Sequence, residues 1–171
     1  MAENFKSKLK NITTLMFDVD GVLTDGKVYF LDNGVPVRNL NNKDAYAIQL
    51  AAKKGYKLVV ITGGSSEIIK DALLRIGFHD VFLKQHDKLS CYKDYLATYD
   101  LKDDNVLYMG DDLPDYEVMR RSGVAACPLD AATEIKELCI YISDKKGGEG
   151  CARDVIEQVL RVRGDWEIAH W

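Results

Sequence analysis

The segment FDVDGVLTDG, residues 17–26, places aspartates where they could do chemistry, directly after a short apolar run. Asp18 and Asp20 are two positions apart, so in an extended chain their side chains leave the same face. Two carboxylates held this close repel each other unless they share a cation. Because no histidine or cysteine stands near them in the sequence, the ligands would be oxygens, which favours a hard ion such as Mg²⁺. Gly21 would let the chain turn sharply beside the ion.

Further residues with useful chemistry follow the later predicted strands. We expect Thr62 and the amides of Gly63 and Gly64 to open the next predicted helix, which is an arrangement that suits an anion. Lys88 opens another predicted helix, and Asp111 follows a later apolar strand. Ligands of parallel α/β sheets bind beyond the carboxyl ends of the strands, so we expect these residues to gather there with the first two aspartates.

Such a set of residues is typical of phosphoryl transfer. One aspartate would attack phosphorus, and a second would give a proton to the leaving oxygen. The metal ion and the lysine would neutralise the phosphoryl oxygens, which the hydroxyl and the amides would orient. Taken singly, each residue has a plainer interpretation, since an aspartate often caps a helix and Thr-Gly often forms a turn. Their occurrence together, each after an apolar strand, favours a catalytic site.

The elements that would position these residues alternate along the chain. Short apolar runs rich in β-branched residues are followed by segments of helical periodicity, which predicts βαβ units and a mostly parallel sheet. The expected strands are residues 13–18, 57–62, 80–84, 105–110, 124–127 and 140–143. The expected helices are residues 44–54, 67–76, 88–99, 114–122, 132–138 and 151–161.

One segment interrupts this alternation. KVYFLDNGVPVRN contains two strand-like runs around the turn signal DNG, which predicts a β-hairpin at about residues 27–39. Its apolar side chains, Val28, Phe30, Val35 and Val37, have to be covered by something. We expect the hairpin to be an assembly surface, and a flap folded over its own domain is the alternative.

The bulk properties restrict the class of protein. A chain of 171 residues is long enough for one domain with a core, and we expect a single domain over residues 1–171. A formal net charge of −4 without a long run of one sign argues against nucleic acid as a partner. No apolar stretch reaches the length of a membrane span, so we expect no membrane partner. The four cysteines form no CxxC pair, and scattered thiols favour a cytoplasmic location.

The sequence resembles a known family at four motifs. DVDGV, ITGG, Lys88 and GDDLPD match, in this order, the motifs of the haloacid dehalogenase-like (HAD) phosphatases, over residues 12–160. The resemblance implies a Rossmann-like α/β fold, in which a mostly parallel sheet is flanked by helices. It also implies a Mg²⁺-dependent phosphomonoester hydrolase that works through an aspartyl-phosphate.

The same resemblance implies roles for individual residues. Asp18 would be the nucleophile and Asp20 the general acid/base. Mg²⁺ would be held by the Asp18 carboxylate, the backbone carbonyl of Asp20, and Asp111. The phosphate-binding residues would be Thr62, Gly63, Gly64 and Lys88. Two further aspartates would support the site from behind the metal ligands: Asp112 and Asp115.

Many members of this superfamily carry a cap domain over the site, and here neither usual insertion point has room for one. The interval before ITGG accommodates a hairpin and one helix, and the interval before Lys88 accommodates one helix and one strand. The site would therefore be open to a phosphorylated macromolecule, or it would be closed over a small molecule by a neighbouring subunit. An acidic chain without a basic groove argues against a polynucleotide substrate.

A narrower resemblance points to the 3-deoxy-D-manno-octulosonate 8-phosphate phosphatases. It is carried by FDVDGVLTDGKVYF, the cap-free spacing, GDDLPD and GGEGCARDV. It implies release of the free sugar acid for lipopolysaccharide synthesis, by a homotetramer that assembles through its hairpins, each site being completed by the neighbour. Arg153 would pair with the sugar-acid carboxylate. Cys151 and Asp154 stand where that family is expected to have alanine and glutamate.

Three alternatives remain open at this point. Many of these enzymes carry an arginine where this chain has Gly64, and a phosphatase of a nine-carbon sugar-acid 9-phosphate carries a glutamate there, so the nine-carbon substrate is one alternative. A second is a non-catalytic oligomerisation module of a sugar-nucleotide synthetase system, and a third is a protein-directed phosphatase. The tail at about residues 163–171 would be either a disordered end or a segment packed on a neighbour.

Overall fold

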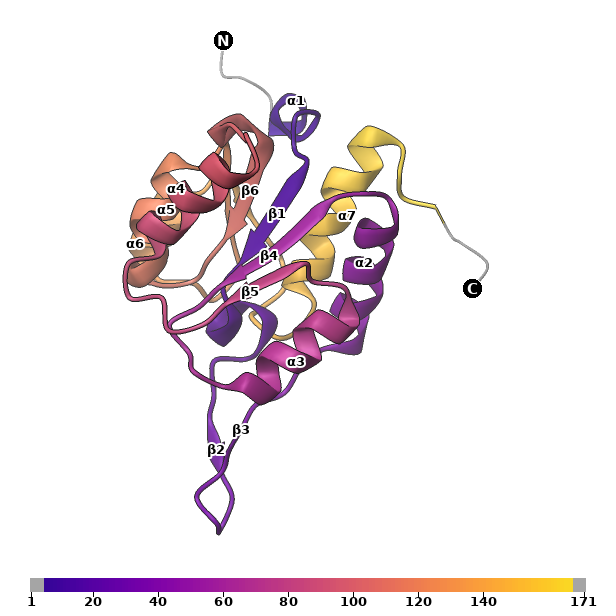
Figure 1. Cartoon of the computed structure of the whole chain (residues 1–171). Helices are drawn as coiled ribbons and strands as arrows, with labels where there is room; N and C mark the ends of the chain where they lie inside the picture. The colour runs from indigo at the N-terminus through magenta and orange to yellow at the C-terminus, as the bar shows by residue number, and fades with distance from the viewer. Residues whose placement is uncertain (1–4, 168–171) are drawn as a thin grey trace.

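A parallel six-stranded sheet forms the centre of the computed structural model, which describes residues 5–167 (Figure 1). The order across the sheet is β5-β4-β1-β6-β7-β8, and every neighbouring pair is parallel. All the predicted strands are present, and each ends at or before its predicted carboxyl end. The strands are β1 (Thr14–Phe17), β4 (Lys57–Ile61), β5 (Asp80–Phe82), β6 (Val106–Met109), β7 (Val124–Cys127) and β8 (Tyr141–Ile142).

The strand order places the site at the middle of the sheet. From β1 the chain moves outward through β4 to β5, and then returns to β6 on the other side of β1. Such a reversal opens a crevice beyond the carboxyl ends of the two central strands. The residues that follow β1 and β6 therefore face the crevice together.

Helices cover both faces of the sheet, and side chains that alternate along each strand pack on one layer or the other. Leu15 and Phe17 belong to a core with the layer of α1, α2, α3 and α7, whereas Met16 belongs to a core with α4, α5 and α6. The helices are α1 (Phe5–Leu9), α2 (Asn42–Lys53), α3 (Glu67–Ile76), α4 (Lys88–Thr98), α5 (Tyr116–Arg121), α6 (Thr133–Leu138) and α7 (Cys151–Arg163). No helix of the described residues is both long and apolar enough to cross a membrane.

The helices differ from the prediction at two places. The segment 114–122 was expected to be one helix, and it divides into the 3₁₀ turn η3 (Leu113–Asp115) and α5. Helix α1 was not expected, because five residues are too few to show a helical period. Tertiary contacts hold it in place: Leu9 is fully buried, and the ring of Phe5 stacks on Tyr141 with centroids 4.7 Å apart.

The predicted hairpin is present and projects from the body of the molecule (Figure 1). Strands β2 (Tyr29–Phe30) and β3 (Pro36–Val37) form a separate two-stranded antiparallel sheet. Gly34 forms the turn with φ of +77°, and its amide donates to the carbonyl of Leu31. The apolar side chains remain exposed, Phe30 to 73%. The hairpin is therefore not folded over its own domain.

Candidate active site

Asp18 directly follows β1 and is almost completely buried, at 8% exposure. The chain then makes the tight turn η1 (Val19–Leu23), in which Gly21 has φ of +85°. A Cβ atom at this position would overlap Oδ2 of Asp111 and lie 2.5 Å from its Cγ. Glycine is therefore required here for two reasons: the left-handed backbone, and the close approach of a carboxylate from the segment after β6.

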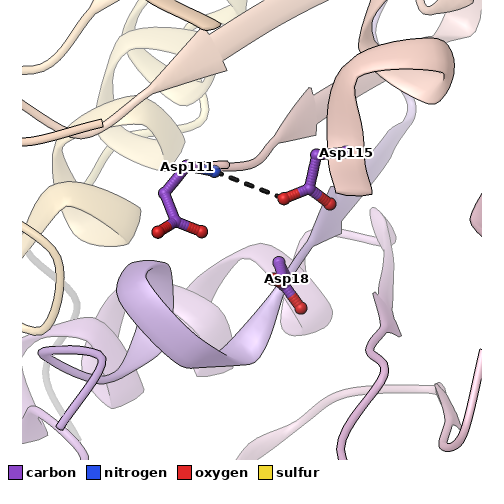
Figure 2. Close-up of side chains that lie close together, drawn as sticks. All are labelled: Asp18, Asp111 and Asp115. Atoms are coloured by element: carbon purple, nitrogen blue, oxygen red, sulfur yellow. Dashed lines mark hydrogen bonds between the residues drawn. The ribbon is translucent and has the colours of Figure 1, made fainter. Parts of the chain in front are cut away.

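Three carboxylates converge beyond the ends of β1 and β6 (Figure 2). Asp18, Asp111 and Asp115 each place an oxygen within 4.8 Å of the others. Gly110 makes this possible, because a Cβ atom there would lie 2.5 Å from Cβ and Cγ of Asp115. The structure thus brings together two of the predicted metal ligands and one of the two predicted supporting aspartates.

Lys88, at the start of α4, joins this cluster with only 4% of its surface exposed. Its Nζ lies 2.7 Å from Oδ1 of Asp115 and 3.0 Å from Oδ1 of Asp18. Burial alone would lower the pKa of Lys88, but the two carboxylates outweigh it and raise the pKa above its ordinary value. The ammonium therefore stays charged, in a position that bridges the two aspartates.

Asp115 already accepts three hydrogen bonds. Besides Lys88, the buried hydroxyl of Tyr108 donates to its Oδ1 at 2.8 Å, and the amide of Asp111 donates to its Oδ2 at 3.4 Å. Asp115 thus orients the lysine and the segment after β6. Sequence reasoning missed Tyr108, because a tyrosine inside an apolar strand is indistinguishable from a core residue.

Charge in this cluster is not balanced by the protein alone. Burial, and then Asp115, raise the pKa of Asp18 to about 6 against the opposing effect of Lys88. Burial, and then the charge of Asp18, raise the pKa of Asp111 to about 7. Oδ1 of Asp18 is buried and makes no hydrogen bond of standard geometry, although Lys88 is near. Because Asp115 already accepts three hydrogen bonds, Asp18 and Asp111 are the carboxylates with more acceptor capacity left for a cation, and an all-oxygen set fits a hard divalent ion.

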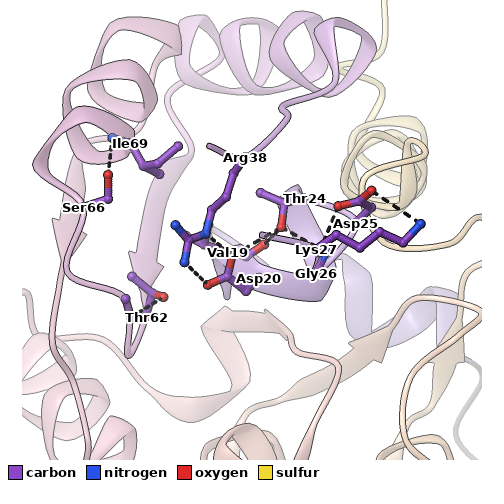
Figure 3. Close-up of polar contacts among 11 residues, drawn as sticks. Val19, Asp20, Thr24, Asp25, Gly26, Lys27, Arg38, Thr62, Ser66 and Ile69 are labelled. Atoms are coloured by element: carbon purple, nitrogen blue, oxygen red, sulfur yellow. Dashed lines mark hydrogen bonds and ion pairs between the residues drawn. The ribbon is translucent and has the colours of Figure 1, made fainter. Parts of the chain in front are cut away.

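The Asp20 side chain does not join the carboxylate cluster and is paired with Arg38. Arg38, just after β3, holds its carboxylate with Nε 2.6 Å from Oδ1 and Nη2 3.3 Å from Oδ2 (Figure 3). The hydroxyl of Thr24 lies 3.4 Å from Oδ1. Sequence reasoning missed Arg38. The only available signal was a cation at the end of the hairpin, and its link to Asp20 spans 18 positions.

Thr62 follows β4 and is buried at 3% exposure. Its Oγ1 accepts from the amide of Gly64 at 3.1 Å. The prediction that Gly63 and Gly64 open the next helix is wrong, because α3 begins at Glu67 and its N-cap is Ser66. These amides therefore belong to a loop. A small pocket beside it is lined by Val19, Asp20, Arg38, Thr62, Gly64, Ser66, Ile69 and Leu83.

Asp112 and Arg153 do not contact the carboxylate cluster through their side chains. Asp112 is exposed and its carboxylate accepts from the amide of Leu113, which caps η3. The guanidinium of Arg153 lies 5.6 Å from the ring centre of Tyr46 and 5.5 Å from that of Trp166. The part of the tail that the structure describes thus packs on its own chain, and residues 168–171 of the predicted tail lie outside the described residues.

The GGEG stretch was expected either to contact substrate or to lead into the last helix, and in the structure it supports the turn after β1. A Cβ atom on Gly147 would overlap the carbonyl oxygen of Gly21. The amide of Gly148 donates to the carbonyl of Val22 at 3.0 Å, and Sγ of Cys151 lies 3.2 Å from the same oxygen. These contacts fix the loop that carries Asp18 and Gly21.

The Asp154 carboxylate, in the first turn of α7, also forms contacts that hold this end of the helix in place. Its Oδ2 accepts from the hydroxyls of Tyr141 at 2.8 Å and Ser143 at 2.7 Å. An aspartate at this position thus ties β8 and the residue after it to the last helix.

Comparison with known proteins agrees with this geometry. The family model for haloacid dehalogenase-like hydrolases matches residues 75–154. The 3-deoxy-D-manno-octulosonate 8-phosphate phosphatase KdsC of Escherichia coli K12 is 32% identical over 163 residues, which cover 95% of this chain and 87% of the relative. KdsC of Yersinia pestis is 31% identical over 99% of this chain and 90% of its own length. The chain belongs to the KdsC family of HAD-like phosphatases.

Solved structures of KdsC-like proteins have the same fold. A crystal structure of a probable YrbI family phosphatase from Pseudomonas syringae superimposes with a TM-score of 0.93 at 35% identity, covering 96% of this chain and 94% of that one. The 3-deoxy-D-manno-octulosonate 8-phosphate phosphatase of Moraxella catarrhalis, in complex with magnesium, phosphate and KDO, gives 0.89 at 28% identity, covering 92% and 90%. The predicted HAD fold, without a separate cap, and the predicted phosphatase activity are confirmed.

Proposed function

We propose that this KdsC family member works as a single catalytic domain that hydrolyses 3-deoxy-D-manno-octulosonate 8-phosphate to the free sugar acid and phosphate. The observation that carries the proposal is the buried cluster in which a single lysine, Lys88, lies between Asp18 and Asp115, while Asp111 places a third carboxylate oxygen within 4.8 Å of theirs. A reaction that brings a cation to the carboxylates and an anion to the lysine fits such a site. The free sugar acid would serve lipopolysaccharide synthesis.

The residues of the cluster and those beside it have separate roles in the reaction. A carboxylate oxygen of Asp18 attacks phosphorus as the bond to the sugar oxygen breaks, and the product is an aspartyl-phosphate. Asp20 gives a proton to the departing sugar oxygen, and then takes one from the water that hydrolyses the acyl phosphate. Lys88 and the Thr62 hydroxyl bind the phosphoryl oxygens. Asp115 keeps Lys88 in place throughout.

Mg²⁺ is the cofactor in this proposal, and Asp18, Asp111 and the backbone carbonyl of Asp20 would hold it. When bound, the ion neutralises the carboxylates and the phosphoryl group that must come together. The fit rests on the all-oxygen donor set and on the two aspartates whose pKa values are raised to about 6 and about 7. The relative from Moraxella catarrhalis, which contains magnesium and phosphate, supports the same assignment.

Assembly is part of the proposal. The exposed apolar hairpin, with Tyr29 at 56% and Phe30 at 73% exposure, would pack against other subunits in a tetramer. A neighbouring subunit would then close the site that lacks a cap. Among the described residues, the four cysteines are free thiols, which supports a cytoplasmic location.

Phosphate release tests the function. The purified protein should release phosphate from octulosonate 8-phosphate in the presence of Mg²⁺ and stop when EDTA is added. The nine-carbon sugar-acid 9-phosphate is the matched competitor, because Gly64 contributes no charged side chain that would reject it. Inactivity on both esters with Mg²⁺ present would refute the sugar-acid assignment. Activity on the nine-carbon ester alone would reassign the substrate.

Asp18→Asn separates catalysis from assembly. The amide cannot act as the nucleophile, so turnover should fall below detection. Sedimentation should show the same oligomer as the wild type, because Asp18 lies at the end of β1 and not on the hairpin. A variant that retains turnover would refute Asp18 as the nucleophile.

A further inference from the structure

The guanidinium of Arg38 is a cation at the rim of the site whose role in the reaction is unassigned. It comes from the end of the hairpin and reaches Asp20 with both Nε and Nη2 (Figure 3). Its side chain is 16% exposed, so the charge is largely withdrawn from water and needs an anionic partner. In this structure that partner is the carboxylate assigned to proton transfer.

Asp20 has to change partners during the reaction. A general acid must hydrogen-bond the leaving oxygen at about 3 Å. Here Arg38 engages both oxygens of Asp20, and Thr24 lies 3.4 Å from one of them. Another anion that takes over the guanidinium would free Asp20 to turn to the ester oxygen.

The cavity next to the guanidinium is small, about 10 Å³, so an incoming anion would need the place that the Asp20 carboxylate occupies. Arg38, Asp20 and Gly64 line the same small pocket. A Cβ atom on Gly64 would lie 3.4 Å from Oγ1 of Thr62 and 3.9 Å from Oδ2 of Asp20, so any larger side chain would enter this space. Glycine therefore keeps side-chain atoms of position 64 out of this cavity.

The alcohol part of the substrate must pass through this region. Its ester oxygen is bonded to the phosphorus that Asp18 attacks and is protonated by Asp20, so the groups attached to it extend toward Arg38. The other candidate, Arg153, is already stacked near Tyr46 and Trp166. A carboxylate can replace that of Asp20 on a guanidinium with the same two parallel hydrogen bonds.

We propose that Arg38 recognises the carboxylate of the sugar acid and releases Asp20 in exchange. Recognition then affects the chemical step, because only a substrate that carries a carboxylate releases Asp20 from its ion pair with Arg38. The proposal rests on the proposed function, since it assumes a sugar-acid ester as the substrate.

The test compares two esters and three variants. The esters are octulosonate 8-phosphate and its analogue with the carboxylate reduced to a hydroxymethyl group. The variants are Arg38→Gln, Arg38→Lys and the control Arg120→Gln, whose arginine lies on the exposed side of α5 beside Glu117. For Arg38→Gln, the ratio of kcat/KM between acid and alcohol ester should fall roughly 10- to 100-fold, the effect of a lost charge-assisted pair. Turnover of the alcohol ester should rise, because Asp20 is no longer held.

Arg38→Lys should give an intermediate ratio, because an ammonium keeps the charge but not the planar pair of donors. The Arg120→Gln control should keep the wild-type ratio, and a thermal melt of each variant checks that it folds. An equal loss on both esters in Arg38→Gln would overturn the proposal, since Arg38 would then only place Asp20. A wild-type protein that does not hydrolyse octulosonate 8-phosphate would instead refute the proposed function.

Discussion

Gly21→Ala tests the metal site at its most crowded point. An added Cβ would lie 2.5 Å from Cγ of Asp111, and ordinary contact begins at 3.4 Å, so the carboxylate must retreat by about 1 Å. A displacement of that size in a catalytic group costs about 100-fold in rate. The left-handed backbone adds about 1–2 kcal/mol of strain for a residue with a side chain.

Gly55→Ala is a matched control for the strain. Gly55 has φ of +88°, close to the +85° of Gly21, but no atom lies within 4 Å of its added Cβ. Both variants should therefore melt about 2–8 °C below the wild type. Only Gly21→Ala should lose about 100-fold in kcat/KM and need more Mg²⁺ for half-maximal phosphate release.

The assay is a Mg²⁺ titration of phosphate release, run beside a thermal melt of each protein. Equal activity of the two variants would show that Asp111 does not need its place beside the turn. Wild-type Mg²⁺ dependence in Gly21→Ala would remove Asp111 from the metal site.

Three further predictions concern stability and assembly. The pKa values of Asp18 and Asp111, raised from 3.8 to about 6 and about 7, make the folded protein bind protons more tightly than the unfolded chain. In EDTA the stability of the folded protein should therefore fall as pH rises from about 4 to 7. Because Mg²⁺ binds the ionised carboxylates, it should raise Tm more at pH 8 than at pH 5. A Mg²⁺ effect on Tm that is independent of pH would contradict this prediction. Asp44→Ala removes the acceptor that lies 2.7 Å from the amide of Arg153 in the first turn of α7. The free energy of unfolding measured in denaturant should fall by about 1–2 kcal/mol, and it should fall less for Asp44→Asn. Phe30→Asp should convert the oligomer to monomers in sedimentation while the circular dichroism of the fold is kept, and an unchanged oligomer would exclude the hairpin as the interface.

The sequence predicted those parts of the site that follow buried strands. A strand covered on both faces has a continuous apolar run, so its end is visible in the sequence, and the next residue must lie at the edge of the sheet. Asp18, Thr62 and Asp111 were found in this way. The turn signal around Gly34 predicted the hairpin for a similar reason, because its chemistry is local.

Sequence reasoning could not predict contacts between distant segments. Arg38 reaches Asp20 across 18 positions, and Asp44 accepts from Arg153 across 109. The stretch that begins at Gly147 supports the turn of Gly21, although it was expected to be a substrate contact or a simple loop. These contacts join segments that are far apart in the chain, so neither the hydrophobic periodicity nor the spacing of motifs indicates them.

The sequence by itself determined the sheet, the hairpin and the acidic chemistry of KdsC-type phosphoryl transfer, because these depend on patterns within a few residues. The tertiary structure alone decided which carboxylates remain for a cation and which are already paired. Asp115 accepts hydrogen bonds from Lys88 and Tyr108, whereas Oδ1 of Asp18 has an ion pair with Lys88 at 3.0 Å but no hydrogen bond of standard geometry. That division depends on how charges pack in a buried crevice, where every neighbour changes the cost of ionisation.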